Sequence, residues 1–263
     1  MSKTALVTGA SSGIGAEFAR QLAARGDNVV LVARNVEALE ALAQQLRDRH
    51  HVRVDVIAQD LATADGVQRV VQELRRRDLR IDLLVNNAGF GTAGRFENIP
   101  PDREHDEVMV NIVAMVDLTH AVLPDMVRRG AGGVINIGST AGYSTLPFFT
   151  TYSASKAFVL QFSLGLWAEL RGRGVNVLAV TPGPVKTPFF DKVGSSDAAI
   201  GPTITPEHVV RSALRGLERN RGYLTPGAGN FAMTHLMPRR PRRFMALASR
   251  TVTRSLADTV TPA

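Results

Sequence analysis

The sequence predicts an α/β protein: a doubly wound parallel sheet of about seven strands, formed as a single domain. Three observations predict this class. Short apolar runs rich in Val, Ile and Leu alternate with segments whose apolar residues recur at helical spacing, a glycine-rich turn follows the first run, and a length of 263 residues fits one large α/β domain. The alternation requires crossover connections, which place helices on both faces of the sheet.

The expected strands are short and almost continuously apolar, as strands covered by helices on both faces are. They are residues 4–8, 28–33, 52–58, 81–86, 133–138 and 175–180, with a seventh short strand at 222–225. The expected helices lie between them, at residues 17–25, 36–49, 65–77, 103–128, 151–171 and 207–220. No internal repeat or linker interrupts the alternation, so we expect one domain.

Residues 188–206 depart from this alternation. The segment contains glycines, prolines and two adjacent phenylalanines, and no regular apolar spacing. It suits a mobile lid over an apolar ligand. The alternative is an ordinary surface connection.

Composition argues against several kinds of site. The chain has no cysteine, which excludes a disulfide framework and a thiolate nucleophile, and its six histidines show no metal-ligand spacing. We therefore expect no metal site. The start, MSKTALVTGA, lacks the order of a signal peptide, and no apolar run approaches the roughly 18 residues that span a bilayer. We expect a cytoplasmic protein.

The first expected strand ends in TGASSGIG, residues 8–15, and a helix follows at once. Glycine permits a tight turn and close approach of the backbone, while the free N–H groups of a helix N-terminus attract an anion. Any tight strand-to-helix connection favours glycine, but this position in an α/β sheet favours the phosphates of a dinucleotide. The residues expected to bind there are Gly9, Ser11, Ser12, Gly13, Ile14 and Gly15.

The end of the second expected strand bears on the choice of cofactor. A site for NAD usually places an acidic residue there for the ribose 2′-hydroxyl, whereas this chain has Ala33, Arg34 and Asn35. A guanidinium pairs with phosphate oxygens, so Arg34 favours the 2′-phosphate of NADP(H) over NAD(H). The alternative is a solvated Arg at the start of a helix.

Further motifs follow in order: Asp60-Leu61, NNAG at 86–89, Asn111, Ser139, YSASK at 152–156 and PGPVKT at 182–187. Together with the glycine-rich turn they resemble the short-chain dehydrogenase/reductase family over roughly residues 3–227. Ser139 lies thirteen residues before Tyr152, the separation that this family uses. The resemblance implies a Rossmann-like fold and NAD(P)-dependent chemistry at CH–OH groups, here of the NADP-preferring type.

The resemblance also implies residue roles. Along the cofactor these are Asp60 and Leu61 at the adenine, Asn87, Ala88 and Gly89 at the adenosine ribose, and Pro182, Gly183, Val185 and Thr187 at the nicotinamide carboxamide. The catalytic tetrad is matched by Asn111, Ser139, Tyr152 and Lys156. Ser12 departs from the pattern, because many NADP-preferring members carry a second basic residue within the glycine motif. The preference for NADP(H) therefore rests on Arg34.

These residue types suit carbonyl reduction. Tyr152 can give a proton to the substrate oxygen, but the pKa of a free phenol is near 10. Lys156 lies one helical turn later on the same face, so we expect its ammonium to lower that pKa and to donate to the nicotinamide ribose; both residues then also bind cofactor. Ser139, at a strand end, would stabilise the substrate oxygen. Asn111 is implied to hold a water linking Lys156 to solvent, or is a structural helix residue.

The sequence thus predicts an NADP(H)-dependent oxidoreductase that interconverts a secondary alcohol and a ketone, or reduces an aldehyde, on a mostly apolar small molecule. The alternative is a non-catalytic regulator or scaffold that senses NADP(H). The presence of Ser139, Tyr152 and Lys156 together favours the enzyme, because a sensor has no use for them. The resemblance further implies a homodimer or homotetramer that packs through the helices at 103–128 and 151–171.

Positive charge is concentrated near the C-terminus. Of the net charge of +7, residues 238–263 carry +5 from six Arg and one Asp. We expect residues 1–227 to form the dinucleotide-binding and catalytic domain, and 228–263 to be a basic extension, helical from about Arg243, that is not an independent domain.

On such a helix one face would hold Phe244, Leu247, Ala248, Val252 and Leu256, with Arg243, Arg250 and Arg254 beside it. The helix could dock on the body, pair with another subunit, or lie peripherally on an anionic membrane. Nucleic acid is a poorer fit, because aromatic residues are not interleaved with the arginines.

Overall fold

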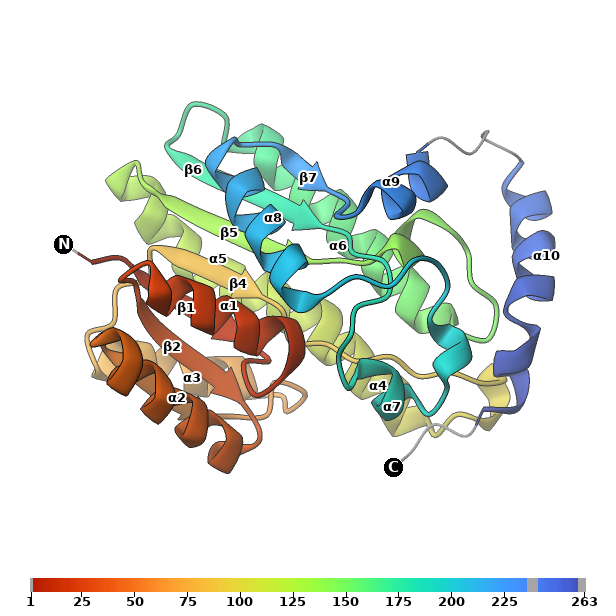
Figure 1. The fold of residues 1–263 in the computed structure, drawn as a ribbon, viewed down its shortest axis with the longest axis horizontal. Coiled ribbons are helices and arrows are strands. Elements are labelled where there is room, and N and C mark those ends of the chain that lie inside the picture. Colours follow the sequence, from red (N-terminus) through yellow and green to blue (C-terminus); the bar gives the residue numbers. More distant parts are fainter. Residues whose placement is uncertain (1, 236–240, 260–263) are drawn as a thin grey trace.

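The structure, a computed structural model, describes residues 2–235 and 241–259. At the centre of these residues is a seven-stranded parallel sheet in the order β3-β2-β1-β4-β5-β6-β7 (Figure 1). The strands are β1 Thr4–Thr8, β2 Asn28–Ala33, β3 Val54–Ala58, β4 Leu83–Asn86, β5 Gly132–Ile137, β6 Val175–Val180 and β7 Gly222–Leu224. The strand order reverses between β1 and β4, the point at which open sheets of this kind bind ligands. The predicted fold class is confirmed.

The strand predictions agree with the structure to within two residues. β1, β2 and β6 have the predicted bounds, whereas β3 and β4 begin two residues later than expected. Successive residues of β1 face different cores, with Leu6 in one and Val7 in the other. Because both faces are buried, these strands are continuously apolar in sequence.

Helices cover both faces of the sheet (Figure 1). One core contains residues of α1 Gly13–Ala24, α2 Val36–His50 and α8 Pro206–Glu218. The other contains residues of α3 Gly66–Arg76, α5 Ala114–Arg129 and the end of α6 Thr150–Glu169. This arrangement leaves the C-terminal ends of the strands uncovered by helices from either layer, so a site can form there.

The helix expected at 103–128 is continuous but not α-helical throughout. It consists of α4 Pro101–Val108, a π-helical turn Met109–Val113 and α5, and the wider turn contains Asn111. Among the described residues, the continuous helix Pro101–Arg129 is the one segment long and apolar enough to cross a membrane by length and composition. Core helices meet the same criterion, and here Leu118 and Met126 are buried against the sheet.

The C-terminal region contains more structure than the sequence predicts. The segment 188–206 includes α7 Phe189–Val193 and a 3-10 helix Ser196–Ala198, and the extension expected at 228–263 contains a first helix, α9 Ala228–His235, directly after β7. α10 Arg242–Val252 begins close to the predicted residue, and the 3-10 helix Arg254–Asp258 follows it. Residues 236–240 and 260–263 of the predicted extension lie outside the described part of the chain.

The predicted apolar face of α10 is divided in the structure. Leu256 is fully buried, in a cluster with Ala93 and Val193 of the body, whereas Phe244 and Leu247 are 56% and 67% exposed. The face is split because the chain changes from α10 to a 3-10 helix before Leu256, which ends the helical spacing. The 3-10 helix Arg254–Asp258 of the extension therefore docks on the body of its own chain.

Candidate active site

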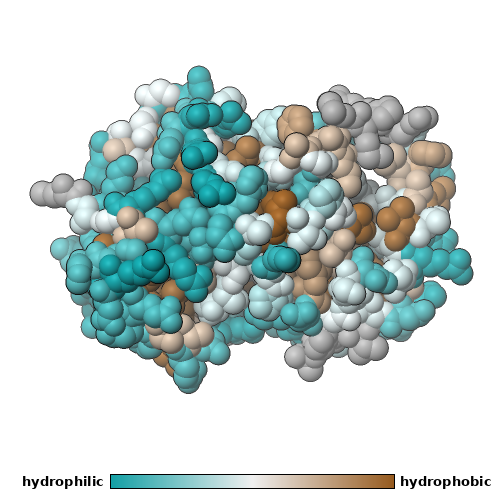
Figure 2. Space-filling model, in the orientation of Figure 1, coloured by the Kyte–Doolittle hydropathy of each residue, from teal (hydrophilic) through white to brown (hydrophobic). Residues whose placement is uncertain are grey.

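A cavity of about 1320 Å³ opens at the C-terminal ends of the strands. Every residue that the sequence predicts for the site lines this cavity except Gly15 and Asn111. In Figure 2 apolar residues gather around the hollow in the right half of the molecule, whereas the left half is mostly hydrophilic. The cavity therefore has one polar arm along the first strands and one apolar arm toward the C-terminal region.

The glycine-rich turn is tightly enclosed. Gly9 has a positive φ of 64°, and a side chain there would come within 2.8 Å of Asn87 Nδ2. Asn87 Nδ2 donates to the Thr8 carbonyl oxygen at 2.9 Å, which ties the end of β4 to the end of β1. Gly15 does not line the cavity; a side chain there would collide with the Gly9 carbonyl. We assign Gly15 to packing of α1 against the turn.

The N-terminus of α1 is open toward the cavity. Ser12 is the N-cap residue in an extended conformation, and its side chain makes no capping hydrogen bond. The first backbone N–H groups of the helix are consequently left for another acceptor. Ser11, Gly13 and Ile14 line the cavity beside it. This geometry fits the phosphates of a dinucleotide.

Arg34 lies at the end of β2, where a cofactor ribose would be bound. Its side chain is 69% exposed, and Nη1 is 3.7 Å from Asp60 Oδ2. Asn35, the next residue, has a structural contact instead: its Oδ1 accepts a hydrogen bond from the Ala38 N–H at 2.7 Å and caps α2. The guanidinium of Arg34 is exposed, and no acidic residue stands at the end of β2 itself, which fits a 2′-phosphate.

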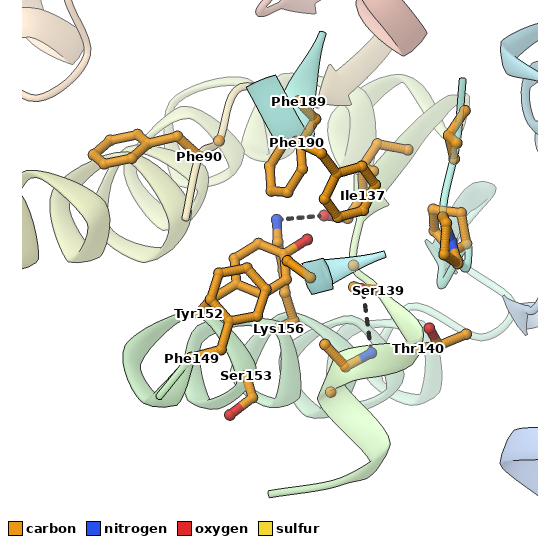
Figure 3. A pocket seen from close by; sticks show the side chains of 18 of the residues that line it. Phe90, Ile137, Ser139, Thr140, Phe149, Tyr152, Ser153, Lys156, Phe189 and Phe190 are labelled. Atoms are coloured by element: carbon orange, nitrogen blue, oxygen red, sulfur yellow. Dashed lines mark hydrogen bonds between the residues drawn. The ribbon is translucent and has the colours of Figure 1, made fainter. Parts of the chain in front are cut away.

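Ser139, Tyr152 and Lys156 meet at the end of β5 (Figure 3). Ser139 directly follows the strand region, and Tyr152 and Lys156 lie one turn apart on α6; all three are buried. The Ser139 hydroxyl acts to lower the pKa of the Tyr152 phenol. Lys156 Nζ is 5.6 Å from the centre of the Tyr152 ring and donates to the Ile137 carbonyl oxygen at 3.1 Å.

The expected effect of Lys156 on Tyr152 is not found in the structure. Burial raises the pKa of the Tyr152 phenol above its ordinary value, and Ser139 opposes this only in part. Burial also lowers the pKa of Lys156 to about 8. The sequence could not give this result, because removing both groups from water penalises both charged forms and here outweighs their mutual attraction.

Asn111 lies behind this group, not in the large cavity. Its Nδ2 donates to the Phe90 carbonyl oxygen at 2.9 Å and to Ser155 Oγ at 3.1 Å, and its Oδ1 accepts from the Phe90 N–H at 3.2 Å. Asn111 and Lys156 both line a second cavity of about 10 Å³. That volume is about the size needed for one water, which suits the implied link from Lys156 toward solvent.

The apolar arm combines the two adjacent phenylalanines that the sequence singled out with residues that it did not. Phe149 stacks on Tyr152 with 4.3 Å between ring centroids, and Phe189 of α7 lies 5.5 Å from the same ring. Figure 3 shows Phe189 and Phe190 facing Tyr152 across the cavity. Met245 and Ser249 of α10 also line it. The paired phenylalanines of the 188–206 segment were the sequence signal for this arm.

Comparison with known proteins identifies the family. A family model described as short chain dehydrogenase matches residues 3–198. The sulfoacetaldehyde reductase 2 of Chromohalobacter salexigens is 40% identical over 202 residues, which cover 76% of this chain and 79% of that protein. The very-long-chain 3-oxoacyl-CoA reductase of Anas platyrhynchos is 37% identical over 222 residues, covering 80% of this chain and 67% of that protein.

Solved structures agree with these relatives. A short-chain dehydrogenase from Sphingobium yanoikuyae in complex with NADPH has a TM-score of 0.81 at 34% identity, covering 99% of this chain and 98% of that one. The bulky-bulky ketone specific alcohol dehydrogenase from Comamonas testosteroni has a TM-score of 0.76 at 33% identity, covering 99% and 97%. On sequence, fold and the order of its motifs, this chain belongs to the short-chain dehydrogenase family.

Proposed function

We propose that this protein is an NADP(H)-dependent oxidoreductase that interconverts a secondary alcohol and a ketone, or reduces an aldehyde, on a mostly apolar small molecule. The observation that carries the proposal is that Ser139, Tyr152 and Lys156 lie together in a cavity whose far wall is aromatic. A proton donor beside an apolar wall suits a carbonyl compound of low polarity.

The polar arm of the cavity would hold the cofactor. The open N-terminus of α1 would bind its phosphates, Asp60 and Leu61 its adenine, and Arg34 the 2′-phosphate. Once bound, the nicotinamide would supply the hydride that reaches the carbonyl carbon. The preference for NADP(H) over NAD(H) rests on Arg34, and its support is an exposed guanidinium where no acidic residue follows β2.

Each of the catalytic residues has a distinct proposed role. Tyr152 gives its phenol proton to the substrate oxygen, or takes it back in the oxidation. Ser139 donates a hydrogen bond to the same oxygen and so stabilises the charge that develops there. Lys156 binds the cofactor ribose, and Asn111 holds the relay of water between Lys156 and solvent.

The partners other than substrate are also proposals. A homodimer or homotetramer through the helices at 103–128 and 151–171 is supported by exposed apolar residues there, Val108 and Phe158. A cytoplasmic location is the simplest setting for such an enzyme. Peripheral membrane contact through the basic extension is supported by the exposed Phe244, Leu247 and Val252, and we place it second to docking on the body.

The experiment that tests the function is a titration of the purified protein with NADPH and with NADH, followed by turnover of ketones and aldehydes graded in chain length and ring size. We expect NADPH to bind more tightly and at least one bulky apolar carbonyl compound to be reduced. Tyr152→Phe should lower kcat by about 10² or more while NADPH still binds, because the proton donor is lost.

The matched control is Tyr223→Phe, which changes a tyrosine of β7 that does not line the cavity. It should leave turnover at the level of the unchanged protein. Full turnover by Tyr152→Phe would refute the mechanism, and tighter binding of NADH than of NADPH would refute the assignment of Arg34.

A further inference from the structure

Two glutamates of α4 meet one threonine behind the proposed catalytic group. Thr92 Oγ1 lies 2.6 Å from Glu104 Oε1 and 2.7 Å from Glu107 Oε2. Glu107 is completely buried, and Thr92 is 1% exposed. A buried carboxylate is costly unless it is paired, and the groups that it meets here are another carboxyl and a hydroxyl.

The geometry determines how many protons this group holds. A threonine hydroxyl has one proton and can donate only one hydrogen bond, so it must accept the other. An ionised carboxylate can only accept, and one of the two carboxyl groups must therefore carry a proton and donate to Thr92 Oγ1. Both distances lie in the range of strong hydrogen bonds between oxygens with an ionised partner. The trio thus holds one proton beyond that of the hydroxyl.

The trio connects the elements that carry the proposed catalytic residues. Glu107 Oε2 also accepts from the Thr92 N–H at 2.7 Å, and Glu107 Oε1 lies 3.4 Å from Asn111 Nδ2. The Thr151 hydroxyl contacts Glu104 Oε2, and Thr151 directly precedes Tyr152 on α6. The two carboxyl groups therefore join α4, the segment that follows β4, and the first turn of α6.

The charged groups around the trio come from two helices. On α6, burial lowers the pKa of Lys156 and the charge of Glu107 opposes this, whereas burial raises the pKa of Tyr152 and the same charge adds to the rise. On α4 itself, the Arg103 guanidinium lies 4.7 Å from the centre of the Phe90 ring. Burial, together with the neighbouring charge of Glu104, raises the pKa of Glu107 to about 7 in spite of the hydrogen bonds from Thr92. This direction agrees with the proton count.

We propose that Glu104 and Glu107 share one proton through the Thr92 hydroxyl, and that this carboxyl pair is a positioning device that holds Asn111 and the Tyr152 end of α6 in the arrangement required for catalysis. The proposal rests on the proposed function for the roles of Asn111 and Tyr152. The pair touches neither substrate nor cofactor. A second ionisation would put two carboxylates on a hydroxyl that can satisfy only one of them, and the connection would loosen.

The shared proton can be measured without turnover. Infrared spectroscopy of the full chain near pH 6 should show the carbonyl band of a protonated buried carboxyl. Glu107→Gln and Glu104→Gln should each abolish it, because the amide donates to Thr92 Oγ1 in place of the acid and the remaining carboxylate then ionises. Glu97→Gln, a change of an exposed glutamate, should leave the band intact. Absence of the band in the unchanged protein, or its persistence in both variants, would overturn the shared proton.

Positioning is tested by comparing two substitutions at one site. Glu107→Gln imitates the protonated acid and should keep kcat near the original value, whereas Glu107→Leu removes the contacts and should lower kcat on the order of 100-fold with NADPH affinity unchanged. Equal loss in both variants would mean that an ionised carboxylate is required, and no loss in either would mean that the pair does not position the site. Should Glu107→Leu fail to fold, the infrared band still tests the shared proton, and kcat of Glu107→Gln still tests whether an ionised carboxylate is required. Activity retained by Tyr152→Phe would instead refute the proposed function and leave the shared proton standing.

Discussion

Glu107 should make the stability of this protein depend on pH in an unusual direction. The pKa of this carboxyl is raised from its ordinary 4.5 to about 7 in the fold. Between these values the folded chain keeps a proton that the unfolded chain has released, so stability falls as pH rises through this window and is level above it. The corresponding free energy is about 3 kcal/mol, at about 1.36 kcal/mol for each unit of pKa.

The substitution that reveals this effect is Glu107→Gln, which cannot titrate. Its free energy of unfolding, relative to that of the unchanged protein, should increase by up to about 3 kcal/mol between pH 4.5 and 7.5. Urea unfolding followed by the fluorescence of Trp167, the only tryptophan, measures it. Carboxyls that are present in both proteins, such as Glu73, contribute equally to both curves and cancel in the difference; hydrogen bonds from Arg76 and Arg77 lower the pKa of Glu73 to about 2.

Glu97→Gln serves as the control, because this residue is exposed and its substitution should shift the curve by the same amount at every pH. Parallel curves for Glu107→Gln and the unchanged protein would show that folding leaves the pKa of Glu107 unchanged. A difference that shrinks as pH rises would show that its pKa is lowered. Either result would refute the reasoning from burial.

Three further predictions concern the two arms of the cavity. Gly9→Ala should weaken NADPH binding and destabilise the fold by about 1–3 kcal/mol, because the φ of Gly9 is 64° and the new methyl group would meet Asn87. Calorimetry measures the binding and thermal unfolding the stability. The control is Gly165→Ala, in open space on α6, which should instead stabilise the fold by about 0.5–1 kcal/mol. Arg34→Ala should raise the Kd for NADPH by about 10- to 100-fold and leave that for NADH nearly unchanged, and an equal effect on both would count against a 2′-phosphate contact. Phe189→Ala should raise KM for a bulky apolar ketone on the order of tenfold with little change for a small aldehyde, as steady-state kinetics would show.

The sheet could be predicted from the sequence because its strands are buried on both faces. Continuous runs such as residues 28–33 leave no alternation to misread, and the glycine-rich turn marks where the first strand ends. The π-helical turn at Asn111 could not be predicted, since the local spacing there is helical either way. The structure reveals the wider turn, in which Asn111 is hydrogen-bonded to Phe90 and Ser155.

The most consequential residue missed from the sequence is Glu107. Two glutamates three residues apart on an amphipathic helix are typical of a solvent-exposed face. The local sequence does not predict that Thr92, from another segment, contacts and buries Glu107. The expected depression of the Tyr152 pKa failed for the same reason. Charge spacing along a helix is readable from sequence, whereas the loss of water around those charges depends on segments distant in the chain.

The weak attachment of α10 has a consequence for how this enzyme could acquire new substrates. None of its residues is buried, although Met245 and Ser249 form part of the cavity wall. Substitutions in a packed core usually cost stability, but side chains here can be exchanged without disturbing the sheet. Substitutions in α10 can therefore change which substrates bind while the residues around Tyr152 stay the same. A library of variants with substitutions confined to α10 is the place to begin changing the substrate specificity of the enzyme.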